Sequence, residues 1–480
     1  MGEVARVAGP VGAAGLALVL AAPGRAGRAV GLAAWAAGGL ALAAYLAPHG
    51  HRPLLAAAGV VGLALAAAGA MVLRRWPWLL ALAALACAPA RIPVHVGGTK
   101  ANLLIPLYGV VAAAALALGW ELLRGEGQLR ELGAFAWPLA AFVAWGGLTL
   151  AWTDDLREGA IELLFFYFPF GLLAISLARL PWSPRWLVAT YGLLVGMAIA
   201  FAGIGVYQWA TRDVFWNPKV IVGNAYAPFY RVNSVFWDPS IYGRFLVVAI
   251  LASLVLVLFG RGRAALYPAA AIAAIWLGLL FSFSQSSFAS LIAGVLAAVT
   301  LLWRWRAAVG LGLVALVLLS VGVAAPQVRH SVLGSSSVGL NKASSGRLKL
   351  VSNGAKIALR HPVGGVGIGA FKRAYAKRLH LRGKEPKSAA SHNTPVTVAA
   401  ETGLPGLALL GWLVVAYALA FPRRLPRTFR DRTELVVALT LGVIAVHSLF
   451  YNAFFEDPMA WGLIALVALA GRQEPLKERN

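Results

Sequence analysis

The chain has 480 residues, of which 60% are hydrophobic and 12% are charged, and its mean hydropathy is +0.76. A soluble domain carries about 25% charged residues, so this composition excludes a soluble globular protein. The formal net charge of +24 does not indicate a nucleic-acid partner, because most basic residues occur in small clusters between apolar runs. Such clusters are typical of the cytoplasmic loops of membrane proteins.

Apolar runs of roughly 18–22 residues recur along almost the whole chain, and each can cross a hydrocarbon core about 30 Å thick. They are rich in Leu, Ala and Gly and lack the alternation of barrel strands, so they predict helices that satisfy their own backbone polar groups. The predicted spans are 29–47, 53–72, 77–94, 102–120, 133–151, 160–178, 186–209, 240–260, 264–281, 285–303, 307–325, 403–421, 433–452 and 457–471. The predicted fold class is an all-α polytopic membrane protein with about 14 transmembrane helices.

Basic residues mark every second connector between these runs, and the positive-inside rule places those connectors in the cytoplasm. They are Arg74/Arg75, Arg124/Arg130, Arg179/Arg185, Arg261/Arg263, Arg304/Arg306 and the arginines at 423–432. The connectors 48–53 and 152–158 have little positive charge and are expected on the outer face. The same alternation predicts that 326–402 lies outside and that both termini lie inside.

Residues 8–22 form a further apolar stretch, which could be another span, a half-inserted helix or a signal-like segment. A short or non-spanning helix is favoured here, because a cytoplasmic N-terminus then fits Arg25 and Arg28. The single cysteine, Cys87, lies in an apolar run and is expected to be a buried small side chain.

The predicted organisation has three parts: a membrane bundle over 1–325, one large extracytoplasmic loop over 326–402, and membrane helices with a short cytoplasmic tail over 403–480. A loop this long is usually functional. Its acids are Glu385 and Glu401 among many Lys and Arg residues, so an anionic partner such as lipid-borne phosphate or diphosphate is expected. The alternative is a solvated basic surface that touches lipid headgroups.

Four short motifs lie in and just after this loop. They are Ser-Ser-Gly-Arg347, His361-Pro-Val-Gly-Gly-Val-Gly-Ile-Gly-Ala-Phe371, Ser391-His392-Asn393 and Glu401-Thr-Gly-Leu-Pro-Gly406. Their order and spacing resemble the O-antigen ligase and polymerase superfamily, which carries Gly-Arg, Pro-x-x-Gly-x-Gly-x-Gly, His-Asn and Glu-x-Gly-x-x-Gly in this region. Upstream, the segment from Arg231 to Pro239 resembles the family's Arg-x-x-Gly-x-Phe-x-x-Pro, with Ser234 where the family usually has glycine.

The resemblance implies a GT-C-like fold, with short helices in the outer loop, in the bacterial inner (cytoplasmic) membrane. It also implies a metal-independent, inverting glycosyltransferase whose active site faces away from the cytoplasm. The donor would be a glycan linked to undecaprenyl diphosphate, and the acceptor would be a hydroxyl on a lipid or glycan. Membrane lipids are the remaining expected partners, and no cofactor is expected. Ligases, repeat-unit polymerases and protein-glycosylating enzymes share these motifs, so all three activities stay open.

One position departs from the family pattern. Many members carry Ser-Arg-Gly where this chain reads Ser-Gln285-Ser. Gln285 could replace that arginine as a neutral donor, or its task could have moved to Arg244 or Arg347. Arg231 and Arg347 are expected to bind the diphosphate, because a planar guanidinium matches phosphate oxygens. The alternative for each is a headgroup anchor.

His392 is the expected catalytic base, because an imidazole exchanges protons near neutral pH. A lone outer-loop histidine is more often a surface residue, and here the motif favours function. Glu401 is expected to orient His392 or an arginine, or else to pair with a loop lysine. Thr394 followed by Pro395 predicts a helix start. Asn393 and Arg360 are assigned to acceptor or loop positioning.

Three other kinds of function receive little support from the residues. The glycines of 364–369 lack the context of a dinucleotide or P-loop site, so a tight turn is favoured over amide contacts to phosphate. No Cys/His ligand spacing occurs, so no metal site is expected. A flippase for the same lipids is the alternative function, although a transporter should show repeat symmetry and polar residues along its spans.

Overall fold

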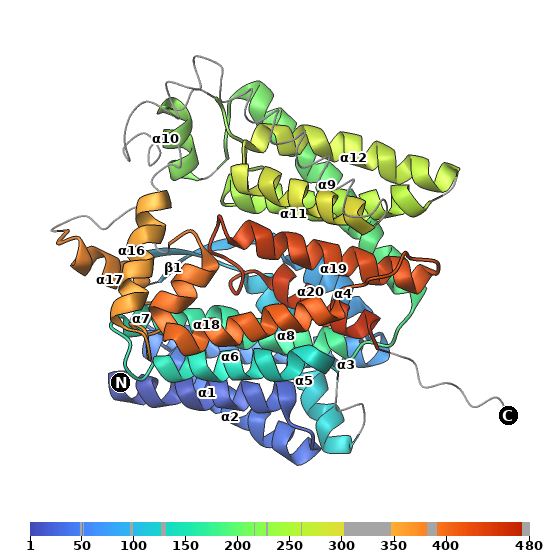
Figure 1. Cartoon of the computed structure of the whole chain (residues 1–480). Coiled ribbons are helices and arrows are strands. Elements are labelled where there is room, and N and C mark those ends of the chain that lie inside the picture. The colour runs from blue at the N-terminus through green and yellow to red at the C-terminus, as the bar shows by residue number, and fades with distance from the viewer. Residues whose placement is uncertain are drawn as a thin grey trace.

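The computed structural model describes residues 1–48, 50, 52–96, 99–125, 131–215, 217–226, 229–260, 262–301, 347–381 and 391–472. Most long helices run side by side, and the short helix α16 crosses their ends (Figure 1). The helices in chain order are α1 Gly2–Ala21, α2 Arg25–Leu46, α3 Arg52–Arg75, α4 Leu79–Cys87, α5 Ile105–Arg124, α6 Ala136–Thr149, α7 Leu156–Glu162, α8 Phe168–Ala178, α9 Pro184–Thr211, α10 Pro218–Tyr226, α11 Pro239–Phe259, α12 Arg263–Ser282, an unlabelled helix Gln285–Leu301, α16 Arg347–Arg360, α17 Phe371–Arg378, α18 Thr394–Ala420, α19 Phe429–Ser448 and α20 Pro458–Ala470.

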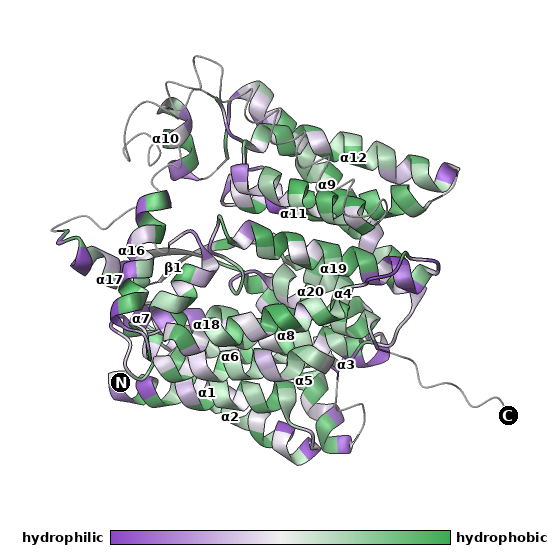
Figure 2. Ribbon diagram, viewed as in Figure 1, coloured by the Kyte–Doolittle hydropathy of each residue, from purple (hydrophilic) through white to green (hydrophobic). Residues whose placement is uncertain are grey.

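Among the described residues, nine helical segments are long and apolar enough to cross a membrane. They are Gly2–Ala21, Arg25–Leu46, Ala56–Arg75, Ile105–Arg124, Leu156–Ala178, Pro184–Thr211, Pro239–Phe259, Arg263–Ser282 and Thr394–Ala420. Hydrophobic residues predominate along the middle of these helices, and hydrophilic residues occur mostly near their ends (Figure 2). The chain is therefore a multi-pass membrane protein, as predicted. The described residues do not show the predicted total of about fourteen spans, and the predicted span 307–325 lies outside them.

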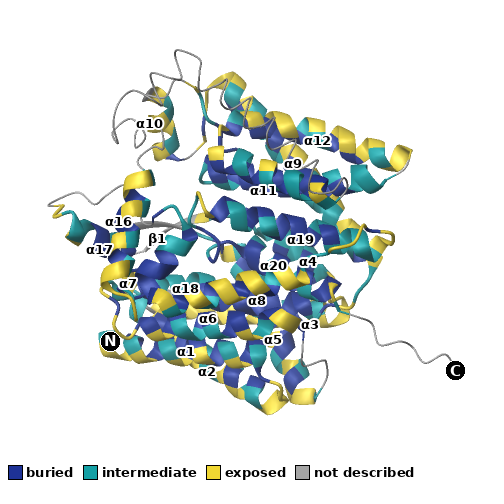
Figure 3. Cartoon of the chain, viewed as in Figure 1, coloured by how far each residue is buried: buried dark blue, intermediate teal, exposed yellow. Residues whose placement is uncertain are grey.

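The helices α8 and α11 are among the most buried in the bundle. Their residues are largely buried, whereas α3 and α12 carry many exposed apolar side chains (Figure 3). Exposed apolar side chains on outer helices are what a lipid environment accommodates, because lipid tails are as apolar as leucine. The bundle thus has an inside-to-outside order that fits a membrane.

The prediction of one continuous helix over 77–94 is wrong. α4 covers only Leu79–Cys87, and the chain then forms an antiparallel hairpin of β1 (Ile92–Val96) and β2 (Thr99–Leu103). Pro89 and Pro93 explain the break, because proline removes a helix hydrogen bond and clashes with the preceding turn. The run was apolar enough to span, but its prolines prevent a helix of that length.

The first helix also differs from the prediction, which favoured a short or non-spanning element at 8–22. α1 has 20 residues and packs along its whole length against α2. Glycines make this close approach possible: a Cβ atom on Gly15 would lie 2.5 Å from the backbone nitrogen of Trp35. Small residues at helix interfaces are the usual route to tight packing in membranes.

The start of α1 lies at the same end of the bundle as α7, α16 and α17 (Figure 1). Arg6 Nη1 donates a 2.7 Å hydrogen bond to the carbonyl of Ala151, beside the connector 152–158. The N-terminus and the connector 152–158 therefore lie at the same end of the bundle, so the predictions of a cytoplasmic N-terminus and of an outer connector are mutually inconsistent. Counting α1 as a full helix adds one crossing to the predicted order and removes this inconsistency.

A buried ionic network joins the start of α2, the end of α5 and the end of α8. Glu131 accepts from Arg28 Nη1 at 2.8 Å and from Arg179 Nη1 at 2.5 Å, and Arg179 also pairs with Glu121 at 2.6 Å. Arg28 and Glu131 are both 1% exposed. One carboxylate therefore neutralises two cations inside the protein.

Replacing Glu131 with alanine is expected to destabilise the fold by about 3–5 kcal/mol, because the buried Arg28 loses its pair with this carboxylate and Arg179 loses one of its carboxylate partners. The melting temperature of purified protein in detergent, followed by tryptophan fluorescence, measures this. Glu434→Ala is the matched control, since its pair with Arg430 is partly exposed and longer, at 3.6 Å, and such pairs contribute about 1 kcal/mol or less. Equal melting temperatures for the two variants would contradict the prediction.

Candidate functional site

Four helices begin close together at the end of the bundle where α16 lies. α11 is capped by Asp238, α18 is capped by Asn393, α16 begins at Arg347, and the helix Gln285–Leu301 starts beside α11. A hydroxyl contact from Ser287 to the carbonyl of Ser240 ties two of these ends together. Each helix N-terminus carries a partial positive charge of about +0.5. Their convergence favours an anionic ligand at this end of the protein.

The structure brings His392, Arg347 and Arg231 together around Asp238. Burial lowers the pKa of His392, the positive charge of Arg347 lowers it further, and the negative charge of Asp238 opposes both effects. Burial also lowers the pKa values of Arg231 and Arg347, which Asp238 again opposes. Asp238 therefore lies within electrostatic range of each of the other three groups. Sequence reasoning predicted three of them and assigned no role to Asp238.

Backbone geometry fixes the position of His392. Its φ of 59° lies in the left-handed region, which non-glycine residues seldom adopt and which often accompanies functional sites. Next to it, the Asn393 side chain accepts from the Val396 amide as the cap of α18 and donates to the carbonyl of Leu449 at 2.9 Å. The predicted helix start is therefore correct to within one residue, with Asn393 rather than Thr394 as the cap. Asn393 holds the motif against the end of α19.

Arg231 is held in an ordered loop before α11. Its backbone exchanges two hydrogen bonds with the Asn224 side chain, and its Nε donates to the carbonyl of Ser282 at 3.2 Å. Ser234 in the same loop has a φ of 51°, a conformation that suits glycine. This conformation explains why the family that this segment resembles usually has glycine at the position. The serine instead bonds through its hydroxyl to the carbonyl of Phe201.

Gln285 stands where many family members carry an arginine, and Arg244 is one of the residues that could replace that arginine's function. The two side chains occupy different environments. Gln285 is exposed at the start of its helix, next to the turn that Arg231 contacts. Arg244 is 3% exposed and forms a 2.9 Å ion pair with Asp457, the residue that caps α20. Arg244 is thus committed to a carboxylate inside the protein. Arg347 is the cation that the structure places beside His392.

Arg360 lies at the far end of α16 from Arg347 and is exposed. Thirteen residue steps of about 1.5 Å separate them by roughly 20 Å along the helix. The structure therefore does not bring Arg360 to the cluster around His392.

Glu401 anchors the glycine-rich segment rather than His392. Its Oε1 accepts from the Phe371 amide at 3.1 Å, and its backbone carbonyl accepts from the Gly367 amide at 2.9 Å. It lies about two turns of α18 beyond the cap at Asn393. Among the described residues, the Glu401 carboxylate contacts neither His392 nor an arginine, as the prediction required. It also contacts no lysine of the loop, which was the alternative.

The glycines of 364–369 allow the loop to lie directly on α18, at the kink made by Gly403. A Cβ atom on Gly365 would be 2.3 Å from the backbone carbonyl carbon of Glu401, and one on Gly367 would be 2.3 Å from the Cα atom of Thr153. The amides of Gly365 and Gly367 donate to carbonyls within the protein. The tight-turn interpretation fits this geometry, and these two amides are already used.

Gly365→Ala is expected to destabilise this docking, because φ is +62° and the added methyl group meets backbone atoms that cannot move away. The left-handed conformation alone costs about 1–2 kcal/mol for a residue with a Cβ atom. A lower melting temperature, with faster proteolysis at 361–371, is the measurement. Gly411→Ala on the same α18 is the control, since nothing lies within 4 Å of its added Cβ. A Gly365→Ala protein as stable as Gly411→Ala would contradict the proposed packing.

Three groups near the site were missed or left without a role. Asp238 carries a visible signal, an acid followed by proline at a helix start. His447 is fully buried, and its Nε2 lies 3.0 Å from the Ser286 hydroxyl while its Nδ1 has no hydrogen-bond partner among the described residues, so the sequence interpretation of a satisfied polar residue holds for one ring nitrogen. Tyr451 lies just beyond α19, where no local sequence pattern distinguishes it from any other interfacial tyrosine. Among the described residues, no group of three or more His, Cys, Asp or Glu side chains gathers as a metal site.

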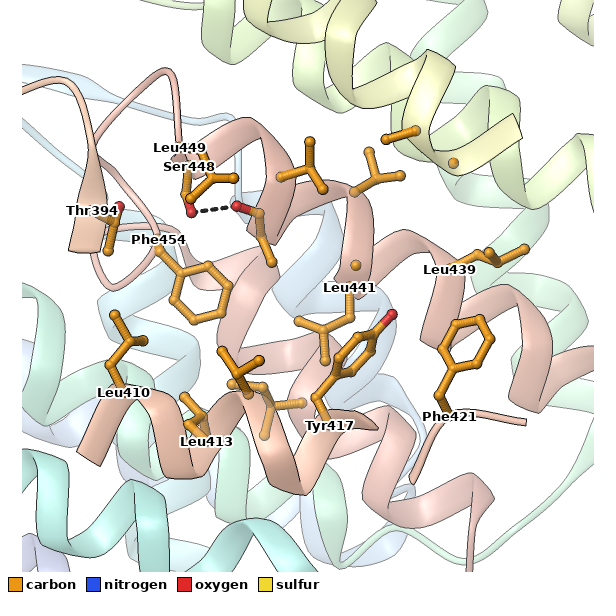
Figure 4. A pocket seen from close by; sticks show the side chains of 18 of the residues that line it. Thr394, Leu410, Leu413, Tyr417, Phe421, Leu439, Leu441, Ser448, Leu449 and Phe454 are labelled. Atoms are coloured by element: carbon orange, nitrogen blue, oxygen red, sulfur yellow. Dashed lines mark hydrogen bonds between the residues drawn. The ribbon is translucent and has the colours of Figure 1, made fainter. Parts of the chain in front are cut away.

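An apolar groove of about 440 Å³ runs between α18, α19 and the helix Gln285–Leu301. Thr394, Ser448 and Leu449 lie at one end and Phe421 at the other, with leucines between them (Figure 4). The first end adjoins His392 and Asn393 through the Asn393–Leu449 hydrogen bond. A long apolar chain could lie in this groove with its polar end at the charged cluster.

Comparison with known proteins shows that part of the chain is similar to a known family. Residues 269–411 match the family model described as O-antigen ligase (Wzy_C). No curated protein matches the chain. The matched stretch contains Gln285, Arg347, His392 and Glu401, and the family resemblance predicted from their motifs is confirmed. Residues 269–411 are therefore similar to the O-antigen ligase family.

Proposed function

We propose that this protein is an O-antigen ligase-type glycosyltransferase, which moves a glycan from undecaprenyl diphosphate to an acceptor hydroxyl at the outer face of the bacterial inner membrane. The observation that carries the proposal is the cluster of His392, Arg347, Arg231 and Asp238 beside the apolar groove. It combines a neutral base, two cations and a path for a lipid tail. A lipid-linked, diphosphate-activated donor matches all three features.

In the proposed reaction, the acceptor oxygen attacks the anomeric carbon while the bond from that carbon to the diphosphate oxygen breaks. The configuration inverts, because attack and departure occur on opposite faces of the sugar. His392 takes the acceptor proton and becomes an imidazolium. Arg231 and Arg347 stabilise the negative charge that develops on the leaving diphosphate. The products are the glycosylated acceptor and undecaprenyl diphosphate.

The two arginines are suited to this role because their like charges repel each other. Burial lowers the pKa of Arg231, and the positive charge of Arg347 lowers it further, whereas the negative charge of Asp238 raises it. A dianionic group between them would relieve that repulsion. Asp238 supplies one negative charge and so leaves the cluster with net positive charge. The helix N-termini of α11, α16 and α18 add to the attraction.

Purified protein in lipid nanodiscs, given an undecaprenyl-diphosphate-linked glycan and a candidate acceptor, tests the proposal. The expected result is a glycosylated product and free undecaprenyl diphosphate, detected by mass spectrometry. The same protein in vesicles with donor in one leaflet tests the flippase alternative. Donor that changes leaflet but is never joined to lipid, glycan or peptide acceptors would overturn the enzymatic proposal.

A further inference from the structure

The ring of Tyr451 lies between two histidines of the outer face. Its centroid is 6.1 Å from the imidazole of His392, with the planes inclined by 59°. It is 5.8 Å from the imidazole of His447, with an angle of 53°. Aromatic rings at 4.5–7 Å in inclined arrangements attract one another beyond their shared burial. One side chain outside the matched family segment thus contacts the predicted base directly.

Behind Tyr451, His447 is held rigidly. It is fully buried, and its Nε2 lies 3.0 Å from the Ser286 hydroxyl. The Ser286 hydroxyl lies 3.1 Å from that of Ser284, which accepts from Ser287 at 2.8 Å. This chain of buried hydroxyls fixes the turn before the helix Gln285–Leu301. Tyr451 therefore rests on a firm support rather than on another mobile side chain.

His392 needs such a support because its own position is strained. The residue has a left-handed backbone, which non-glycine residues seldom adopt. Asn393 anchors the backbone on its C-terminal side through Leu449. Among the described residues, none hydrogen-bonds the imidazole itself, so ring packing is the contact that can set its plane. An active base must be held to within a fraction of an ångström, since a 1 Å misplacement can cost about 10²-fold in rate.

We propose that Tyr451 is a positioning residue for His392, whose ring, supported by His447, sets the plane of the imidazole and shields it from water. The inference rests on the proposed function for its kinetic consequences. Its structural content is independent of the reaction. It assigns the role to the aromatic ring of Tyr451 and not to its hydroxyl.

The electrostatic surroundings of His392 make the shielding measurable. Arg347 from α16 and Asp238 at the start of α11 face it with opposite charges, and Tyr451 faces it from the connector after α19. Burial is the largest cause of its lowered pKa. Removing the Tyr451 ring admits water, so the pKa of His392 should rise toward the ordinary histidine value of about 6.5. The charged neighbours stay unchanged in that variant.

The test compares Tyr451→Ala with Tyr451→Phe, and with Tyr191→Ala as a control. Tyr191 is a half-buried tyrosine that bonds Ser253 at 3.0 Å, on α9 and α11. We expect Tyr451→Ala to lower kcat by about 10- to 100-fold with little change in the donor KM. The acid limb of its pH profile should also lie at a higher pH than in the parent, because the pKa of His392 is raised. Tyr451→Phe and Tyr191→Ala should keep the parent pH profile and most of kcat.

A second measurement does not depend on turnover. Carbon-13 labelling of histidine Cε1 and NMR titration give the pKa of His392, with His392→Asn identifying its signal. The expected result is an increase in this pKa in Tyr451→Ala and none in Tyr451→Phe. An unchanged pKa in Tyr451→Ala, or a Phe variant as defective as the Ala variant, would overturn the inference. Parent protein that forms no product, with the NMR shift present, would instead reject the proposed function alone.

Discussion

Replacing His392 with alanine is expected to reduce glycosyl transfer by about 10²–10⁴-fold, the usual contribution of a general base. The protein should still fold, because His392 lies before α18 and its neighbour Asn393 keeps the helix cap. Product formation in nanodiscs from a lipid-linked donor is the measurement. Asparagine tolerates the left-handed backbone better than alanine, so His392→Asn should be equally inactive and at least as stable. His361→Ala, at an exposed histidine of the same outer segment, is the control that should remain active.

The same residue predicts the pH dependence of transfer. Burial and the charge of Arg347 lower the pKa of His392 below its usual value of about 6.5. The base must be neutral to accept a proton, so activity is present above the lowered pKa and is lost as the pH falls through it. The acid limb of the kcat profile should therefore lie below pH 6.5. Full activity of His392→Ala, or an acid limb that persists in His392→Asn, would show that another group accepts the proton.

Replacing Arg347 with alanine is expected to lower transfer by about 10²–10³-fold, comparable to loss of one preorganised donor to a developing negative charge. Arg347→Lys should recover part of the activity, because lysine keeps the charge but cannot present two parallel donors to phosphate oxygens. Donor affinity and kcat, measured separately, should both fall. Lys356→Ala, at an exposed lysine of the same α16, is the matched control and should behave like the parent.

A companion substitution tests the departure from the family pattern. Gln285→Arg should be tolerated if this exposed position faces the same diphosphate, and it should partly compensate for Arg347→Lys. Unaltered donor affinity and transfer in Arg347→Lys would show that Arg347 does not bind the diphosphate. Loss of folding in Gln285→Arg would show that this turn has no room for a longer side chain.

The sequence was sufficient for properties that depend on local composition. Apolar runs of membrane-spanning length identified a multi-pass helical protein, because burial in lipid constrains each run separately. The motifs around Arg347, His392 and Glu401 identified the family for the same reason, since they are short and nearly contiguous. Errors arose where a local rule competed with another, as when the prolines at 89 and 93 ended an apolar run.

Tertiary packing alone decided which side chains meet. Asp238 lies 154 positions before His392, and Tyr451 lies 59 positions after it, so no periodicity or spacing links either to the histidine. Glu401 was expected near His392 because the motifs adjoin, but two turns of α18 separate them and the carboxylate meets Phe371 instead. Likewise, whether residues 8–22 form a full helix depended on glycines in α1 and α2 that let two backbones touch. A single sequence records what each segment prefers, whereas these contacts depend on how the helices pack against one another.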